Sequence, residues 1–495
     1  MVLARVLALR LVALLAVVGA VAAPAAGAGP SASPSPPSSP LARRLDAALD
    51  APALRGARLA ALVVDRASGE VLYARDPDRP LVPASNLKVL TGVAALAHFG
   101  PAHRFTTRVL APAPPDADGA VAWLAVRGGG DPALTSEQWW RLAADLRAQG
   151  LRRVRGDLIV DGGAFDAERW HPGWAPLTAR AYHAPVGGLA ANYGAFKVVV
   201  EPGASPGAPV RVRVDPPVPY FDVAAEARTA PPGGRHRIRV DRETRPDGDR
   251  VRVSGTLPRD AATVEVYRSV SWPARYAGAV LRMQLEANGV RVDGAVRAAP
   301  APASAHELLA FEGHALATIA RLFLKNSNNM IAEALVKAMA LPRGQDGSAV
   351  GDAAAAADWS RGLAVVRDTL SGLGLDPRTL VLVDGSGLAR ANRVPVRQLV
   401  AALRAADRSF AFGPELLAAL PLAAADGTLE RRADAAAGAV RAKTGLLSGV
   451  TGLSGFARAG EREVVFSVLA NGYRAADGDA MAALDGFAAA LVAPR

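Results

Sequence analysis

Residues 83–97 read PASNLKVLTGVAALA, and this stretch determines how the rest of the chain is interpreted. Apolar residues recur at helical spacing from Leu87 to Ala97, so we expect a helix that begins near Ser85. Ser85 and Lys88 are three residues apart, and on a helix they share one face within hydrogen-bonding reach. Such a lysine can take the serine's proton if burial and a neighbouring cation lower its pKa. A lone Ser-x-x-Lys is more often an exposed surface pair, so this interpretation needs support from elsewhere in the chain.

Two later motifs supply that support. They are Ser327-Asn328-Asn329 and Lys443-Thr444-Gly445. Only five of the 57 basic residues are lysine, and three of those five lie in or beside the motifs. Arginine in a protein cannot lose its proton, so a retained lysine indicates a site that needs a neutral amine. Each motif is weak alone, and the three together predict one site.

The residue types in these motifs fit acyl transfer, which needs a nucleophile, a proton shuttle and donors for the oxyanion and the substrate carboxylate. Ser85 would attack and Lys88 would be the base. Ser327 could relay a proton to the leaving group, and Asn329 could position the substrate amide and hydrogen-bond Lys88. Lys443 would supply positive potential.

The last motif also predicts how a substrate lies. A strand over residues 442–445 would let a peptide-like substrate pair along its edge. Gly445 has no side chain to block that approach.

Together the motifs resemble the signature of penicillin-binding proteins and related serine β-lactamases. More narrowly, the chain resembles the low-molecular-mass class C D-alanyl-D-alanine carboxypeptidase/endopeptidase family, whose members carry a long insertion between the first two motifs. Here that gap runs from Lys88 to Ser327, and the resemblance extends from about Ala60 to the C-terminus. Further stretches that resemble the family are Arg127–Pro132, Val154–Leu158, Asn326–Asn329 with Ala332-Glu333, Asp384–Leu388, Asp426–Leu429 and Leu453–Phe456.

The resemblance implies a role for each motif residue. Ser85 is the acylated nucleophile, Lys88 the base, and the remaining pocket consists of Ser327, Asn329, Lys443, Thr444 and Gly445. The oxyanion hole would be formed by the N–H groups of Ser85 and Leu446. Leu446 is the clearest departure, because the family commonly has a hydroxyl residue there that helps to bind the terminal carboxylate. Carboxylate recognition would then rely on Thr444 and Lys443, and Ala389 likewise stands where a serine is usual.

The expected fold class is α/β (α+β), a transpeptidase domain like that of penicillin-binding proteins and serine β-lactamases, with an antiparallel sheet flanked by helices. This domain comprises residues 41–104 and 304–495, interrupted by a strand-rich insertion of one or two subdomains at residues 105–303. Within it we predict a β-hairpin at 61–74, helical segments at 315–341 and 353–373, strands at 450–458 and 463–470, and a last helix at 480–492.

The N-terminus resembles a secretory signal. Arg5 and Arg10 precede an apolar run from Leu11 to Ala23 that small residues follow, so residues 1–28 are predicted to be a signal peptide. A retained membrane anchor is the alternative, although the apolar run is shorter than the roughly 20 residues that span a bilayer. Residues 29–40 are rich in Ser and Pro and are predicted to be a linker. We therefore expect a secreted, extracytoplasmic protein without a stable membrane span.

Composition excludes several other classes. The 495 residues contain no cysteine, which rules out disulfides, thiolate metal sites and thiol catalysis, and seven scattered histidines argue against zinc. A net charge of +11 is compatible with nucleic acid, acidic polymers and membrane surfaces alike, so charge alone does not identify a partner. The resemblance implies peptidoglycan stem peptides as substrates and β-lactams as inhibitors, with no nucleic acid, metal or cofactor.

Two alternatives share the fold. One is a catalytically weak cell-wall binding or scaffolding homologue, which the missing hydroxyl at Leu446 makes conceivable. The other is a β-lactamase, disfavoured because no glutamate in a recognisable context supplies the base for rapid deacylation. Asp384–Leu388 is interpreted as a tight turn and not a nucleophile elbow, because aspartate stands where the elbow needs glycine.

Overall fold

The computed structural model describes residues 39–174, 176–342 and 356–493. The predicted signal peptide and all but the last two residues of the predicted linker lie outside the described residues. The rest, from Pro40 onward, groups into one compact unit by its internal contacts.

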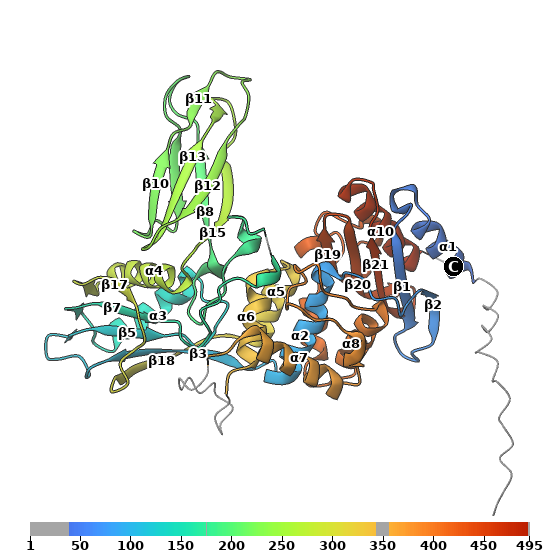
Figure 1. Ribbon diagram of the computed structural model, residues 1–495, viewed down its shortest axis with the longest axis horizontal. Helices are drawn as coiled ribbons and strands as arrows, with labels where there is room; N and C mark the ends of the chain where they lie inside the picture. The colour runs from blue at the N-terminus through green and yellow to red at the C-terminus, as the bar shows by residue number, and fades with distance from the viewer. Residues whose placement is uncertain (1–38, 175, 343–355, 494–495) are drawn as a thin grey trace, which may run out of the picture. The chain divides into compact units, whose positions relative to one another are not determined.

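The central sheet is antiparallel and has five strands in the order β19-β20-β21-β1-β2 (Figure 1). The strands are β1 (Arg58–Asp65), β2 (Val71–Arg75), β19 (Val440–Leu447), β20 (Val450–Ala459) and β21 (Arg462–Asn471). Strands from the two ends of the chain are neighbours, because β1 pairs with β21 over eight residues. The predicted hairpin and the predicted C-terminal strand pair are confirmed.

Helices cover both faces of this sheet, which explains why β1 is apolar along its length. Ala60, Leu62 and Val64 belong to one hydrophobic core, whereas Leu59 and Val63 belong to another on the opposite face. Side chains alternate across a strand, so a strand buried on both faces needs an apolar residue at every position. On one side lie α1 (Pro40–Leu49) and α10 (Asp477–Val492). On the other lie α2 (Leu87–Phe99), α5 (Leu316–Lys325), α6 (Asn329–Met339), α7 (Trp359–Gly372), α8 (Val396–Asp407) and α9 (Gly413–Ala419).

Helix α2 lies at the centre of this second layer and contacts α5, α6, α7 and α8. Every residue from Leu87 to Leu96 is buried, including Lys88. A helix that is buried all round places even its polar residues in a low-dielectric environment. The fold therefore puts the amine of Lys88 in the interior.

The helical segment predicted at 315–341 is two helices. Helix α5 ends at Lys325 and α6 begins at Asn329. Between them Ser327 has a φ of 54°, in the left-handed region, and the side chain of Asn328 caps α6 by accepting a hydrogen bond from Ile331 N at 3.0 Å. The hydrophobic periodicity of the sequence continues across the break because both helices bury an apolar face.

The residues between the first two motifs form further sheets. A mixed sheet has the order β17-β7-β5-β3-β18, and α3 (Ser136–Ala148) and α4 (Pro273–Ala287) belong to its hydrophobic core. Its strands are β3 (Arg104–Ala111), β5 (Leu124–Arg127), β7 (Leu158–Asp161), β17 (Val296–Ala298) and β18 (His306–Ala315). A small sheet beside it contains β4 (Ala120–Val121), β6 (Arg153–Val154) and β16 (Arg291–Val292). Strand β18 pairs with β3, so this strand pairing continues past residue 303, where the sequence suggested a boundary.

A strand-rich subdomain, residues 195–269, forms another part of the insertion (Figure 1). It contains β8 (Ala195–Glu201), β9 (Arg211–Asp215), β10 (Phe221–Ala225), β11 (Arg228–Ala230), β12 (Arg239–Thr244), β13 (Asp249–Ser254), β14 (Thr256–Pro258) and β15 (Val264–Ser269). Among the described residues, none of the helices has both the length and the apolar character needed to cross a bilayer.

Candidate active site

The Ser85 hydroxyl and the Lys88 amine are hydrogen-bonded. Ser85 lies in a short 3-10 turn, η2 (Ala84–Asn86), that leads directly into α2, and Lys88 Nζ is 3.0 Å from Ser85 Oγ. The same amine donates to Asn329 Oδ1 and to the carbonyl oxygen of Ser386, each at 2.7 Å. The preceding residue, Ala84, has a φ of 46°, a conformation uncommon for a residue with a side chain and typical of strained functional sites. The first and second motifs therefore meet as predicted from their chemistry.

Burial lowers the pKa of Lys88 to about 7, although the negative charges of Asp384 and Glu333 act to raise it. A lysine with this pKa is neutral for much of the time near neutral pH and can accept a proton. Burial also lowers the pKa of Lys443 well below its usual value, and the nearby Lys88 and Arg432 lower it further. Lys443 donates to the carbonyl oxygen of Thr444 at 2.8 Å.

Glu333 holds the backbone of Gly385 and Ser386 next to the site, a role that the sequence did not predict. Its carboxylate is fully buried and accepts hydrogen bonds from Gly385 N, Ser386 N and Trp359 Nε1 at 2.7 to 3.1 Å. Burial and the charge of Asp384 raise the pKa of Glu333. A signal was present, because a glutamate within the apolar run of α6, four residues after Asn329, shares that residue's helix face.

The segment 384–388 is a tight turn, as predicted. Asp384 accepts from Gly387 N at 2.8 Å, from Ala389 N at 2.7 Å and from Asn392 Nδ2 at 2.8 Å. Gly387 has a φ of 82°, and a Cβ there would lie 1.8 Å from the carbonyl oxygen of Ala84. The turn therefore packs against the residue that precedes the nucleophile.

A cleft of about 640 Å³ opens over Ser85. Four predicted site residues, Ser85, Ser327, Asn329 and Leu446, line it. Leu446 is 43% exposed there. The other residues that line the cleft are Gly173, Trp174, Arg180, Tyr182, His183, Gly387, Leu388, Arg390, Leu447, Ser448 and Asp477.

The other predicted residues, Lys88, Lys443, Thr444 and Gly445, are buried behind that surface. Thr444 donates to the hydroxyl of Thr428 at 2.8 Å. The structure gives a second reason for a glycine at position 445. A Cβ at Gly445 would lie 2.4 Å from Asn86 Nδ2 and would collide with the turn that carries Ser85.

The insertion contributes one wall of the cleft. Trp174, Arg180, Tyr182 and His183 all come from it. Asn329 Nδ2 donates to the carbonyl oxygen of Tyr182 at 2.9 Å, so the second motif touches this wall directly. Sequence reasoning missed these residues because nothing in their local pattern indicates that they approach motifs far away in the chain. Among the described residues, no group of three or more His, Asp or Glu side chains is placed to hold a metal ion.

Comparisons with known proteins agree with this geometry. Residues 41–491 match the D-Ala-D-Ala carboxypeptidase 3 (S13) family. The chain is 39% identical over 451 residues to a D-alanyl-D-alanine carboxypeptidase of Actinomadura sp. strain R39, an alignment covering 88% of this chain and 81% of the relative. It also resembles the crystal structure of penicillin binding protein 4 from Haemophilus influenzae, with a TM-score of 0.75 and 25% identity over 90% of this chain and 98% of that one. A second structure of that protein is a complex with a β-lactam. The predicted fold class and family are confirmed.

Proposed function

From the premise that the chain belongs to the D-Ala-D-Ala carboxypeptidase 3 (S13) family and is a serine D-alanyl-D-alanine carboxypeptidase, we propose that Ser85 forms its acyl-enzyme. The observation that carries this assignment is the 3.0 Å hydrogen bond between Ser85 Oγ and the fully buried amine of Lys88. A serine hydroxyl is a weak nucleophile until a neighbouring base takes its proton.

The reaction follows from these contacts. Neutral Lys88 takes the Ser85 proton as Oγ attacks the carbonyl carbon of the penultimate D-alanine. The N–H groups of Ser85 and Leu446 would stabilise the oxyanion. Ser327 relays the proton from Lys88 to the departing amine of the terminal D-alanine as the C–N bond breaks, which leaves Lys88 neutral again. Water then attacks the ester and gives its proton to Lys88. Lys88 passes this proton to Ser85 Oγ as the ester C–O bond breaks, and the peptide leaves with Ser85 restored.

Asn329 and the third motif position the substrate. Asn329 Oδ1 already accepts a hydrogen bond from Lys88, which fixes the side-chain amide at the cleft surface. Lys443 would supply the positive potential that attracts the terminal carboxylate and Thr444 would hydrogen-bond it, and Gly445 and Leu446 complete that side of the site. Leu446 cannot donate a hydrogen bond to the carboxylate, so we infer that this pocket binds the C-terminal D-alanine weakly. The proposed mechanism uses no metal and no cofactor.

The same acyl-enzyme chemistry extends to two further compounds. D-Ala-containing cross-links of peptidoglycan present the same carbonyl as the stem-peptide terminus, so endopeptidase activity is part of the proposal. β-Lactams carry an amide that Ser85 would open to form a stable ester, which makes them inhibitors. The Haemophilus influenzae relative that was crystallised with a β-lactam supports this.

The proposal includes where the enzyme acts. Residues 1–28 would be cleaved as a signal peptide and residues 29–40 would be a linker, so the catalytic part works outside the cytoplasm, where peptidoglycan lies. Residues 41–104 and 304–495 would form the transpeptidase domain and residues 105–303 its insertion, with β18 (His306–Ala315) returning from the domain side to pair with β3 in the sheet of the insertion.

The test is intact-mass spectrometry after brief exposure to benzylpenicillin. We expect one adduct on the wild type and none on Ser85→Ala or Lys88→Ala. Lys197→Ala is the matched control, because Lys197 lies on β8 in surface ion pairs with Glu265 and Asp215 and should keep the adduct. A folded wild type without an adduct, or an adduct on Ser85→Ala, contradicts the assignment. Release of D-alanine from a D-Ala-D-Ala peptide then measures the carboxypeptidase, and continuous turnover of benzylpenicillin would indicate a β-lactamase.

A further inference from the structure

One segment of the insertion lines the cleft and contacts both helix α6 and the residues next to the strand-rich subdomain. We call residues 166–174 and 176–186 the wall segment, because Trp174, Arg180, Tyr182 and His183 in it line the cleft. Its beginning is held by α6, where Lys337 Nζ donates to Asp166 Oδ1 at 2.5 Å and to the carbonyl oxygen of Glu168 at 2.7 Å. The Lys337 amine also lies 3.6 Å from the centre of the Trp359 ring. This end of the wall segment is therefore fixed to the helix that carries Asn329.

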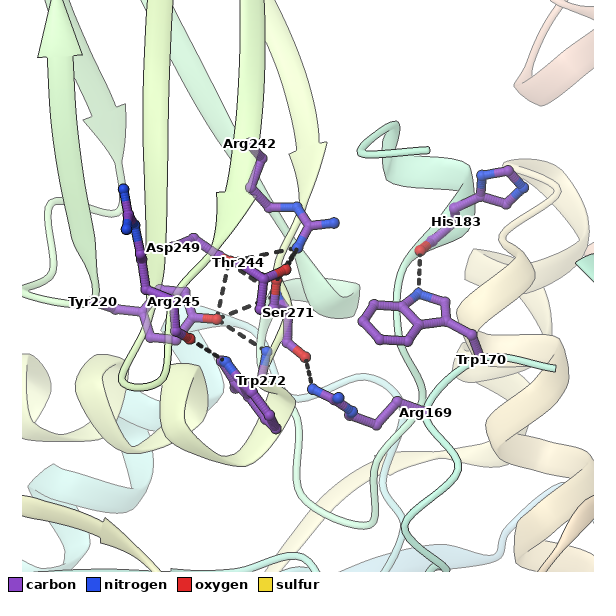
Figure 2. A network of polar contacts seen from close by, with 10 residues as sticks. All are labelled: Arg169, Trp170, His183, Tyr220, Arg242, Thr244, Arg245, Asp249, Ser271 and Trp272. Carbon is purple, nitrogen blue, oxygen red and sulfur yellow. Dashed lines mark hydrogen bonds and ion pairs between the residues drawn. The ribbon is translucent and has the colours of Figure 1, made fainter. Parts of the chain in front are cut away.

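The next residue, Arg169, joins the wall segment to Ser271 and Trp272, which follow the last strand of the strand-rich subdomain (Figure 2). Its Nη1 donates to the carbonyl oxygen of Ser271 at 2.6 Å. The guanidinium carbon lies 3.8 Å from the centre of the Trp272 ring and 4.9 Å from that of Trp170. A charge-assisted hydrogen bond combined with stacking between two rings holds a partly buried arginine in one orientation.

Ser271 is itself held by the subdomain. Its N–H donates to Asp249 Oδ2 at 2.9 Å, and Tyr220 Oη donates to the same oxygen at 2.9 Å. Arg242 contacts both the Ser271 hydroxyl and Asp249, whose side chain is completely buried. A buried carboxylate with this many partners fixes the groups around it, so Ser271 presents its carbonyl to Arg169 from a rigid base.

From Arg169 the contacts continue to the reacting groups. Trp170 Nε1 donates to the carbonyl oxygen of His183 at 2.8 Å, which Figure 2 shows on the side away from the subdomain. The adjacent carbonyl, that of Tyr182, accepts from Asn329 Nδ2, while Asn329 Oδ1 accepts from Lys88. The amide of Asn329 is thereby held at both ends, and one of its two partners belongs to the wall segment.

We propose that Arg169 and Trp170 are positioning residues of the carboxypeptidase, which hold the Tyr182 carbonyl against Asn329 from the strand-rich subdomain. They do not touch the reacting atoms. Without them the wall loses its hydrogen bonds to Ser271 and His183, and the Asn329 amide is free to turn its NH₂ group toward the Lys88 amine. That NH₂ group would then compete with the Ser85 hydroxyl for the lone pair of the neutral lysine. This inference rests on the proposed roles of Asn329 and Lys88. The inference gives the strand-rich subdomain an indirect role in catalysis, through the position of the wall segment.

The test compares matched pairs of variants in the full mature chain. Arg169→Met removes the donors and the charge at similar length, and Trp170→Phe removes the indole N–H and keeps a smaller aromatic ring. Arg141→Met is the control for the first, because Arg141 donates to the Glu312 carbonyl at 2.6 Å and lies 4.4 Å from the Phe311 ring centre, the same chemistry at another place in the insertion. Trp140→Phe controls the second, since Trp140 is 51% exposed on α3. Arg169→Lys restores one donor and the charge.

We expect kcat/KM for a D-Ala-D-Ala peptide to fall about tenfold or more in Arg169→Met and Trp170→Phe, because small displacements of positioning groups are costly to catalysis. The two controls should stay within about twofold of the wild type, and Arg169→Lys should recover most of the loss. Benzylpenicillin should still label Ser85 to one equivalent in every variant, which shows that the nucleophile is intact. If Arg169→Met fails to fold, Trp170→Phe decides the question.

The proposal is overturned if Trp170→Phe and Arg169→Met keep the wild-type kcat/KM. It is also overturned if the control variants Arg141→Met and Trp140→Phe lose as much activity as Arg169→Met and Trp170→Phe. A wild type that neither releases D-alanine nor takes up benzylpenicillin overturns the proposed function instead. The two failures are therefore distinguishable.

Discussion

The carboxylate of Glu333 accepts a hydrogen bond from the N–H of Ser386 at 2.7 Å, and the carbonyl oxygen of the same Ser386 accepts one from Lys88 at 2.7 Å. One peptide segment thus connects a buried acid with the proposed catalytic base. The carboxylate fixes the turn, and the turn fixes the amine. Because all three groups lie in a low-dielectric interior, the charge of Glu333 also acts on Lys88 directly.

The pH dependence of acylation should report Lys88. Its pKa is about 7, and only the neutral amine can accept the Ser85 proton. The rate of acylation by benzylpenicillin should therefore rise with pH through about 7 and level off above it. Lys88→Arg keeps a cation that cannot deprotonate, so we expect a loss of about 10² to 10⁴-fold at every pH. A Lys88→Arg protein that is acylated as fast as the wild type would contradict the role of Lys88.

Glu333→Gln should change both stability and pH profile. The amide would present N–H groups to the N–H donors of Gly385 and Ser386, which should cost about 1–3 kcal/mol in the free energy of unfolding. Removing the negative charge should also lower the pKa of Lys88, so the rise in acylation rate moves to lower pH. Glu286→Gln is the control, because Glu286 lies in an exposed i,i+4 ion pair with Arg282. Denaturant unfolding and the pH–rate profile test this, and an unshifted profile would mean that Glu333 does not act on Lys88.

Leu446→Thr should improve substrate binding. Leu446 is exposed in the cleft and offers no donor to the substrate carboxylate. A hydroxyl there should raise kcat/KM for D-Ala-D-Ala peptides about tenfold, since a hydrogen bond to a charged group contributes about 1.5–3 kcal/mol. Leu446→Val has nearly the shape of threonine without the hydroxyl and should show no gain. Equal activities of the two variants would place the carboxylate elsewhere.

Gly445→Ala should slow acylation without touching the substrate. The added Cβ would lie 2.4 Å from Asn86 Nδ2 and 3.0 Å from the Pro83 carbonyl oxygen, so the turn that carries Ser85 must move. We expect the benzylpenicillin acylation rate to fall about 100-fold. Gly486→Ala on α10 has open space around its Cβ and serves as control. An acylation rate that stays unchanged in Gly445→Ala would show that the turn tolerates the displacement.

Local spacing was enough to predict part of the site. Ser85 and Lys88 face each other because three residues on one helical turn place them so, and no distant contact is needed for that. The strands of the central sheet were predictable for a similar reason, because a continuous apolar run such as residues 59–64 specifies a strand buried on both faces. The break between α5 and α6 was not predictable, since it depends on the left-handed conformation of Ser327 and not on hydrophobic periodicity.

The sequence by itself determined the reaction class, because three short motifs name a nucleophile, a base and their polar partners. Only the tertiary structure decided the pKa of the base and the groups that hold these residues in position. Whether Lys88 is neutral depends on the burial of α2 within its layer of helices and on two carboxylates, Glu333 and Asp384, that lie about 250 to 300 positions further along the chain. The wall at Tyr182 is likewise brought to Asn329 by packing. Desolvation and Coulomb interactions depend on distance in space, and chain order does not encode that distance.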